Sequence, residues 1–204
     1  MKKMTFLFFL SMLSLNVFSQ HIIEDEALVG WINPPAEIVI PDEASSIKRG
    51  VLSDNPTITS VDFNNVSIIE SGALKNCIRL DTVNMPNVRR VNARALEGAV
   101  RLEHVSIPQG VIIQALAFNG CRSLTSVELP SMRVIKRGAF SQCRSLTTVD
   151  LSKAVNLREV EGSGDPNNAP FDLNNKNLTI YVSDESKMDL FPAPNRRKYT
   201  VKIK

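Results

Sequence analysis

Histidine is scarce in this sequence, and neither sign of charge is in large excess. Only two histidines occur, His21 and His104, and no serine or cysteine nucleophile is tied to His104 by its spacing. The nucleophile, base and orienting group of a catalytic triad are therefore missing. Lysine and arginine number 24 against 21 aspartates and glutamates, which does not amount to the clustered basic stripe of a nucleic-acid-binding protein. These absences predict no catalytic residues and no nucleic-acid partner.

Long hydrophobic runs are also absent after residue 20, so that part of the chain has no segment long enough to span a membrane. Before it, Lys2 and Lys3 precede an uncharged apolar run from Thr5 to Val17, which is shorter than the roughly 20 residues that cross a bilayer. This pattern predicts a secretory signal peptide at residues 1–19, cleaved between Ser19 and Gln20. A retained membrane anchor is the alternative. We expect an exported protein that is secreted, periplasmic or associated with the cell surface.

The sequence does contain a regular repeat of 22 residues. The pentapeptide CRSLT begins at Cys121 and again at Cys143, and rows of 22 residues align three apolar columns through the chain. A fixed period of this length marks a solenoid, in which each coil buries its apolar side only by stacking on its neighbours. The clearest column consists of valines: Val61, Val83, Val105, Val127 and Val149.

Each row carries two short apolar segments. The first reads L-x-x-V-x-apolar and is often followed by proline, an alternation that predicts a strand with its middle residue facing solvent. The second contains the column Ile69, Val91, Ile113 and Ile135, followed by a tight turn or a single helical turn. We expect two narrow parallel ladders on either side of a thin core. About six coils of 22–23 residues would form a rod of about 30 Å.

The repeat array is expected to span residues 37–160, between two terminal segments. Residues 20–36, with Trp31 and an NPP break, are predicted to form an N-terminal cap over the first coil. Residues 161–204 begin with a surface loop rich in Gly, Asn, Asp and Pro. We expect a strand, a short helix capped by Ser183 and a final strand to follow and to close the C-terminal end of the core.

The row C-x-x-L-x-x-V-x-L-P-x-x-x-x-I-x-x-x-A-F-x-x-C resembles the BspA-like leucine-rich repeats of bacterial surface and secreted proteins. The resemblance covers about residues 37–204, including the ending NLTIYVSDESKMDLF. It implies a right-handed leucine-rich-repeat solenoid, rich in β-structure and of the α/β type, that binds proteins or cell surfaces. Some members of the family are described as adhesins. Two departures are the missing asparagine ladder of ordinary leucine-rich repeats and the shortness of the array.

The three cysteines, Cys77, Cys121 and Cys143, share one column with Asn55 and Ala99. Small residues that interchange in one column predict a buried ladder, because a free cysteine packs as a small hydrophobe. A disulfide between Cys121 and Cys143 is the alternative, since these residues would lie one coil apart. Zinc is not expected, because no nearby histidine completes a set of four ligands.

We predict no cofactor and no metal. The loop at residues 162–177 offers hard oxygen ligands for calcium, but it lacks the ordered alternation and closing glutamate of a calcium loop. An ordinary insertion therefore accounts better for its oxygen-bearing residues: Asp165, Asn167, Asn168 and Asp172.

The outward positions of the first ladder are polar to acidic, and basic residues gather around the second. Recurrence at one register would place the polar residues on one rigid surface, which suits a macromolecular partner. We predict a non-enzymatic module that binds a protein or a cell-surface component such as a glycan. The alternatives are a surface that is merely solvated and an enzyme or glycan-binding accessory protein with an unrecognised site. The candidate face consists of Asp62, Asp81, Asn84, Glu103, His104, Ser106, Glu128 and Asp150. The basic residues are Lys48, Arg49, Arg89, Arg90, Arg133, Lys136 and Arg137.

Overall fold

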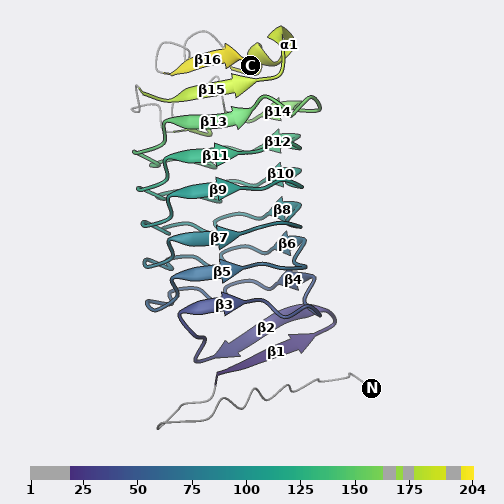
Figure 1. The fold of residues 1–204 in the computed structure, drawn as a ribbon, viewed down its shortest axis with the longest axis vertical. Coiled ribbons are helices and arrows are strands. Elements are labelled where there is room, and N and C mark those ends of the chain that lie inside the picture. The colour runs from purple at the N-terminus through teal and green to yellow at the C-terminus, as the bar shows by residue number, and fades with distance from the viewer. Residues whose placement is uncertain (1–18, 163–168, 172–176, 192–198) are drawn as a thin grey trace.

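Two short strands per coil stack on their counterparts in the neighbouring coils. The computed structural model describes residues 19–162, 169–171, 177–191 and 199–204 of the 204-residue chain. Within these ranges the chain is a parallel β-solenoid of about seven turns with almost no helix. Figure 1 shows the coils stacked along the long axis, beginning at the hairpin of β1 (Gln20–Glu24) and β2 (Ala27–Ile32). The predicted solenoid fold is confirmed.

The first ladder places the predicted valine column in register. Val61 pairs with Val83, and Val127 pairs with both Val105 and Val149. Pairing is parallel within β3–β5–β7 and within β9–β11–β13–β15–β16, and β7 lies next to β9. The ladder contains β3 (Glu37–Val39), β5 (Ser60–Asp62), β7 (Thr82–Asn84), β9 (His104–Ser106), β11 (Ser126–Glu128), β13 (Thr148–Leu151), β15 (Thr179–Val182) and β16 (Thr200–Ile203).

The second ladder is a continuous sheet on the other side of the core. Its two-residue strands pair in parallel, while β1 and β2 pair antiparallel at one end. After β2 the ladder contains β4 (Ser46–Ile47), β6 (Ile68–Ile69), β8 (Arg90–Val91), β10 (Ile112–Ile113), β12 (Val134–Ile135) and β14 (Glu159–Val160). The inward-facing apolar residues of both ladders, such as Val61, Val127 and Ile69, are buried between them. The prediction of two ladders around a thin core is therefore confirmed.

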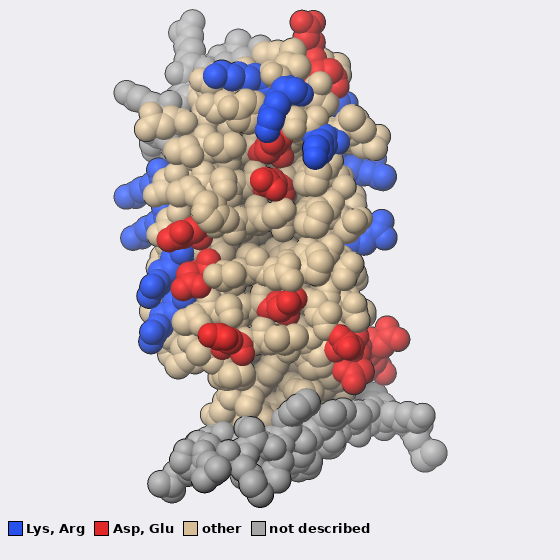
Figure 2. Space-filling model, in the orientation of Figure 1, with Lys and Arg blue, Asp and Glu red and all other residues tan. Residues whose placement is uncertain are grey.

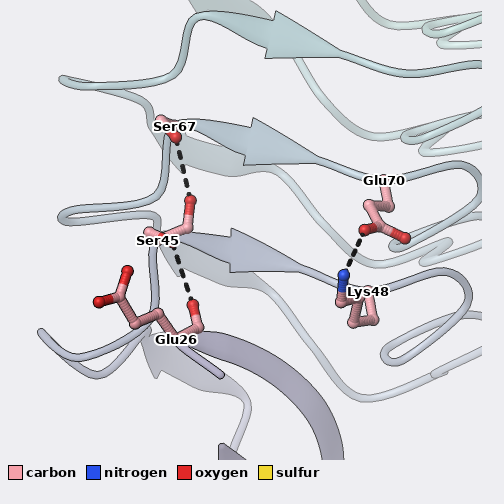
Figure 3. Close-up of polar contacts among 5 residues, drawn as sticks. All are labelled: Glu26, Ser45, Lys48, Ser67 and Glu70. Atoms are coloured by element: carbon pink, nitrogen blue, oxygen red, sulfur yellow. Dashed lines mark hydrogen bonds and ion pairs between the residues drawn. The ribbon is translucent and has the colours of Figure 1, made fainter. Parts of the chain in front are cut away.

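Serine hydroxyls tie the first coils of the second ladder together. Ser45 Oγ donates to the carbonyl of Glu26 at 3.2 Å, and Ser67 Oγ donates to the carbonyl of Ser45 at 3.2 Å. Figure 3 shows these serines stacked one above the other, with the Lys48–Glu70 ion pair of 2.9 Å beside them. The hairpin of β1 and β2 is thus bonded directly to the first repeat.

Two residues with positive φ recur in the turns that follow the second-ladder strands. Gly138 has φ +62° and begins the segment GAF, and the same position in the coil before it is Leu116 at φ +60°. Glycine adopts this left-handed conformation without the Cβ clash that other residues meet. The two columns consist of Gly50, Gly72, Arg94, Leu116 and Gly138, and of Asp54, Asn76, Gly98, Gly120 and Gln142.

The C-terminal segment extends the solenoid further than the sequence predicts. Strands β15 and β16 join the first ladder in parallel, so the rod has about seven turns and not about six. The rings of Phe118 and Phe140 stack at 5.3 Å between centroids, and those of Phe140 and Phe171 stack at 5.7 Å. The aromatic stack therefore continues from the repeats into the segment after them.

The short C-terminal helix begins one residue later than the Ser183 cap predicts. Helix α1 (Glu185–Met188) has Asp184 as its N-cap, and the Asp184 side chain accepts a hydrogen bond from the Ser186 backbone nitrogen. Ser183 instead donates its hydroxyl to the Asp184 carboxylate at 2.7 Å. The Ser183 prediction was wrong, because the carboxylate next to it takes the capping position.

Candidate functional site

The structure aligns most of the candidate face along the axis of the rod. Asp62 is in register with Asn84, and Glu128 is in register with both Ser106 and Asp150. His104 belongs to the neighbouring column, while Asp81 and Glu103 directly precede their strands. The eight residues thus lie in three adjacent columns of one ladder. Figure 2 shows acidic residues along and to the left of the middle of this view and in a group at its lower right edge, with basic residues along the left edge, the upper right edge and the C-terminal end.

Some members of the candidate face serve the fold as well as the surface. Asp62 accepts hydrogen bonds from the Asn64 backbone nitrogen at 2.9 Å and from the Asn84 side chain at 3.0 Å. The side chain of Glu128, by contrast, is exposed. A charge change at Glu128 therefore tests binding more cleanly than one at Asp62.

His104 lies among hydroxyl groups of the next coil. Its Nδ1 is 2.8 Å from Ser126 Oγ and 3.2 Å from Thr125 Oγ1. Both the ring and these contacts are exposed, and within the described ranges no carboxylate orients the ring. Ser126 lies one 22-residue repeat after His104 and is in register with it, so the expectation that no serine is tied to His104 by its spacing was wrong. A catalytic triad would also need an orienting acid beside this pair.

The candidate face ends at a basic and aromatic patch that the sequence analysis did not include. Tyr181 is in register with Asp150, and Lys202 is in register with Tyr181. Lys204 Nζ is 2.7 Å from Asp150 Oδ2 and 5.2 Å from the centroid of the Tyr181 ring. The alternation of LTIYV and of YTVKI could have revealed Tyr181 and Lys202 as further outward positions.

The contacts of Asp150 alter its titration. Partial burial by itself raises the pKa of Asp150, but hydrogen bonds from Lys204 and Ser152 outweigh this effect and hold the pKa below its usual value. Asp150 therefore stays ionised and bound to the last residue of the chain at neutral pH. Reversing its charge would break this link as well as alter the surface.

The basic residues around the second ladder fall into two groups. Lys136 Nζ contacts Glu159 at 2.5 Å and Glu161 at 3.4 Å, and Lys48 is paired with Glu70. In the described part of the chain, by contrast, no ion pair forms with the predicted arginines: Arg49, Arg89, Arg90, Arg133 and Arg137. The arginines therefore carry the available positive charge on this side.

The cysteine column is a ladder of buried thiols, as the sequence predicts. Each thiol donates to a carbonyl of the preceding coil: Cys77 to Leu52 at 3.1 Å, Cys121 to Leu96 at 3.4 Å and Cys143 to Phe118 at 3.2 Å. None of the three is joined in a disulfide, so the Cys121–Cys143 alternative is not realised. Burial raises the pKa of Cys77 to about 11.

The described residues contain no group of three or more side chains suited to hold a metal ion. The calcium candidates Asp165, Asn167, Asn168 and Asp172 lie outside these residues, as do residues 1–18 of the predicted signal peptide. The described part also has no helix long and apolar enough to cross a membrane.

Comparison with known proteins places these features in context. The sequence profile described as "BspA type Leucine rich repeat region" matches residues 11–121 and 90–162, in six copies. No curated protein matches the chain.

Solved structures show the same architecture. The chain is similar to the pneumococcal vaccine antigen PcpA, with a TM-score of 0.68 and 13% identity over 90% of this chain. It spans 46% of the length of that protein. It is also similar to the leucine-rich repeat protein TpLRR of T. pallidum, with a TM-score of 0.67 and 20% identity over 78% of this chain and 74% of the other. At these identities the likeness shows the fold alone.

Proposed function

Because the chain belongs to the BspA-type leucine-rich repeat family, we propose that it is an exported binding module without catalytic activity. Repeats of this family suggest protein binding or a surface role. We assign binding to the candidate face defined above, and a protein at the cell surface is the partner that this assignment favours. Solenoids present extended, rigid surfaces of this kind.

One observation carries the proposal: polar side chains recur in register along one ladder. The backbone of every strand in this ladder is held by parallel pairing, so the outward side chains start from fixed positions. A partner therefore meets a preorganised surface and loses less conformational entropy on binding. The acidic members favour a partner with a basic surface, because complementary charge accelerates encounter.

The test reverses two exposed acids on the face. The double variant Glu103→Lys/Glu128→Lys changes the net charge by +4, and neither residue is buried. The control Glu24→Lys/Glu43→Lys makes the same change at exposed positions outside the face. The partner is first captured from host and bacterial surface fractions with the mature chain, and its association rate is then measured at low and high salt.

We expect the face variant to associate roughly threefold to tenfold more slowly at low salt and to lose most of its salt dependence, because charge acts mainly on the encounter rate. The control should behave like the unmodified chain. Binding that survives the face reversal but is lost when Arg89, Arg90, Arg133 and Arg137 are neutralised would assign the partner to the basic side instead. Turnover in a broad hydrolase screen that is abolished by His104→Ala would overturn the non-catalytic proposal.

Export is a separate part of the proposal. Lys2, Lys3 and the apolar run that follows support a cleaved signal peptide. Intact-mass measurement of the exported protein should show a chain that begins at Gln20, with or without cyclisation of that residue. A mature protein that retains Met1 would refute this assignment.

A further inference from the structure

The regular spacing between the two ladders is broken once near the C-terminal end. Leu129, at the end of one first-ladder segment, is six positions before Ile135, and Phe63 is likewise six positions before Ile69. Leu151, however, is nine positions before Val160. The three extra residues enlarge the turn at 152–157, which carries the exposed side chain of Val155.

This enlarged turn forms one wall of a surface hollow. The hollow has a volume of about 360 Å³, and Lys153 to Asn156 line it on one side. Three cations surround it: Arg89, Arg133 and Lys153. Its volume lies at the small end of the range of ligand pockets, roughly 300–1,000 Å³.

Val111 forms the floor of the hollow, at a position where the coils on both sides carry arginine. The residue just before each second-ladder strand is Arg89, then Val111, then Arg133 and then Arg158 in four consecutive coils. Val111 donates its backbone N–H to the carbonyl of Arg89 at 2.8 Å, and Arg133 donates to the carbonyl of Val111 at 3.0 Å. Arg89 and Arg133 therefore flank the short Val111 side chain, two coils or roughly 10 Å apart.

Toward the N-terminal end of the rod, the same column carries serine in place of arginine. There the residues are Ser45 and Ser67, whose hydroxyls donate to the carbonyls of Glu26 and Ser45, respectively (Figure 3). In this column, arginine therefore occurs only from Arg89 onward, toward the C-terminal end of the rod. In the described part of the chain, neither Arg89 nor Arg133 forms an ion pair.

Neutral hydrogen-bonding groups complete the lining. Gln109 and Ser131 occupy equivalent positions in successive coils, and Asn156 belongs to the enlarged turn; all three line the hollow together with the cations. The Ser131 hydroxyl donates to the carbonyl of Pro108 at 2.7 Å, so its oxygen can still accept a hydrogen bond. Apolar surface is limited to a few side chains, which include Val111, Pro130 and Val155.

We propose that this hollow binds an acidic saccharide through its carboxylate or sulfate groups. Guanidinium groups recognise either anion by paired hydrogen bonds. The amides and the serine oxygen between them suit sugar hydroxyls, while Val111 and Pro130 offer apolar surface to the C–H face of a sugar ring. A run of acidic peptide side chains would also use the cations, but it brings no sugar-ring C–H face to Val111 and Pro130.

Acidic residues lie beside the hollow on one side. Glu128 and Asp150 line an adjoining hollow of about 300 Å³ that shares Pro130 and Lys153 with the first. Asp150 is bound to Lys204 there. The anionic groups of the ligand therefore lie on the Arg89 and Arg133 side of Pro130, away from the candidate face.

The experiment measures binding of defined probes to the mature chain by calorimetry. The probes are tetragalacturonate, its methyl ester, a heparin-derived tetrasaccharide and a hexaglutamate peptide. Binding of tetragalacturonate identifies a carboxylate ligand, and binding of the heparin fragment alone identifies a sulfate ligand. Either result supports the proposal, provided that the neutral ester does not bind. Failure of both acidic saccharides, or equal binding of hexaglutamate, overturns it.

Two variants distinguish a specific binding site from nonspecific attraction by the positive charge of the surface. Arg89→Gln/Arg133→Gln should weaken saccharide binding at least tenfold, whereas the control Arg49→Gln/Arg137→Gln removes the same charge outside the hollow and should leave it unchanged. Val111→Arg adds a positive charge but fills the floor, in a column where arginine already stands in the coils on both sides. We expect Val111→Arg to weaken binding. Tighter binding by this variant would show that charge alone attracts the saccharide, and would refute the site.

Discussion

The buried thiol of Cys77 should make the stability of the repeat array depend on pH in the alkaline range. Cys77 is fully buried and donates its S–H to the carbonyl of Leu52 at 3.1 Å. Burial, with a smaller effect of nearby Asp54, raises its pKa from 9.0 to about 11. Below pH 9 the thiol is neutral in both the folded and the unfolded chain, so its contribution is complete. Between pH 9 and 11 only the unfolded chain gains a thiolate, and stability falls.

The size of this loss follows from the shift in pKa. At about 1.36 kcal/mol per pKa unit, the rise from 9.0 to about 11 corresponds to a full loss of about 2.7 kcal/mol. Roughly 2 kcal/mol of this loss falls between pH 9 and 11, because the unfolded chain is already half ionised at pH 9 and the folded chain is half ionised at pH 11. At pH 7 the substitution Cys77→Ala should cost on the order of 1 kcal/mol, because it removes one sulfur from the core. Ala99 already occupies the equivalent position two coils before Cys143.

The assay is urea unfolding of the unmodified chain and of Cys77→Ala at pH 8, 9, 10 and 11. Lysines and tyrosines also titrate in this range, so the relevant quantity is the difference between the two free energies of unfolding. We expect this difference to shrink as the pH rises and then to reverse in sign. A difference that stays constant from pH 8 to 11 would refute the reasoning. Thiol reagents should also leave Cys77 unmodified in the folded chain and modify it only after unfolding, since the reactive form is the thiolate.

Two further substitutions test the turns and the aromatic stack. Gly138→Ala should lower the free energy of unfolding by about 1–2 kcal/mol or more, because φ is +62° and the new Cβ would meet a Leu116 methyl at 2.7 Å. Gly72→Ala has a similar φ of +65°, but its new Cβ would meet Lys75 Cβ at an ordinary 3.9 Å. A loss as large as that of Gly138→Ala would show that the contact with Leu116 is unimportant. Phe140→Ala should cost about 3–5 kcal/mol, because it leaves a cavity and removes the ring that stacks on both Phe118 and Phe171. In hydrogen exchange it should also loosen β15, and protection there equal to that of the unmodified chain would argue against a stack that couples the C-terminal segment to the repeats.

Much of the architecture could be predicted from the sequence, because each coil contacts mainly its neighbours. A residue and its counterpart 22 positions later meet in the same ladder, so the period alone places Val127 beside Val105 and Val149. The burial of Cys121 follows from the same column. The outward alignment of Glu128 and Asp150 was predictable for this reason too, although their role in binding stays a proposal.

Two features lie outside the 22-residue period, and only the tertiary structure reveals them: the contact of Lys204 with Asp150, and the hollow. Lys204 lies 54 residues after Asp150 in the chain, and only the parallel pairing of β15 and β16 brings the two together. The hollow likewise depends on three extra residues before Val160 that face the short side chain of Val111 two coils earlier. The 22-residue repeat by itself determined the coils, the two ladders and the buried columns, because neighbouring coils repeat the same local contacts. Tertiary stacking decided the number of turns, the end of the acidic face and the cationic hollow, because these arise where the repeat is interrupted and no column predicts the neighbour.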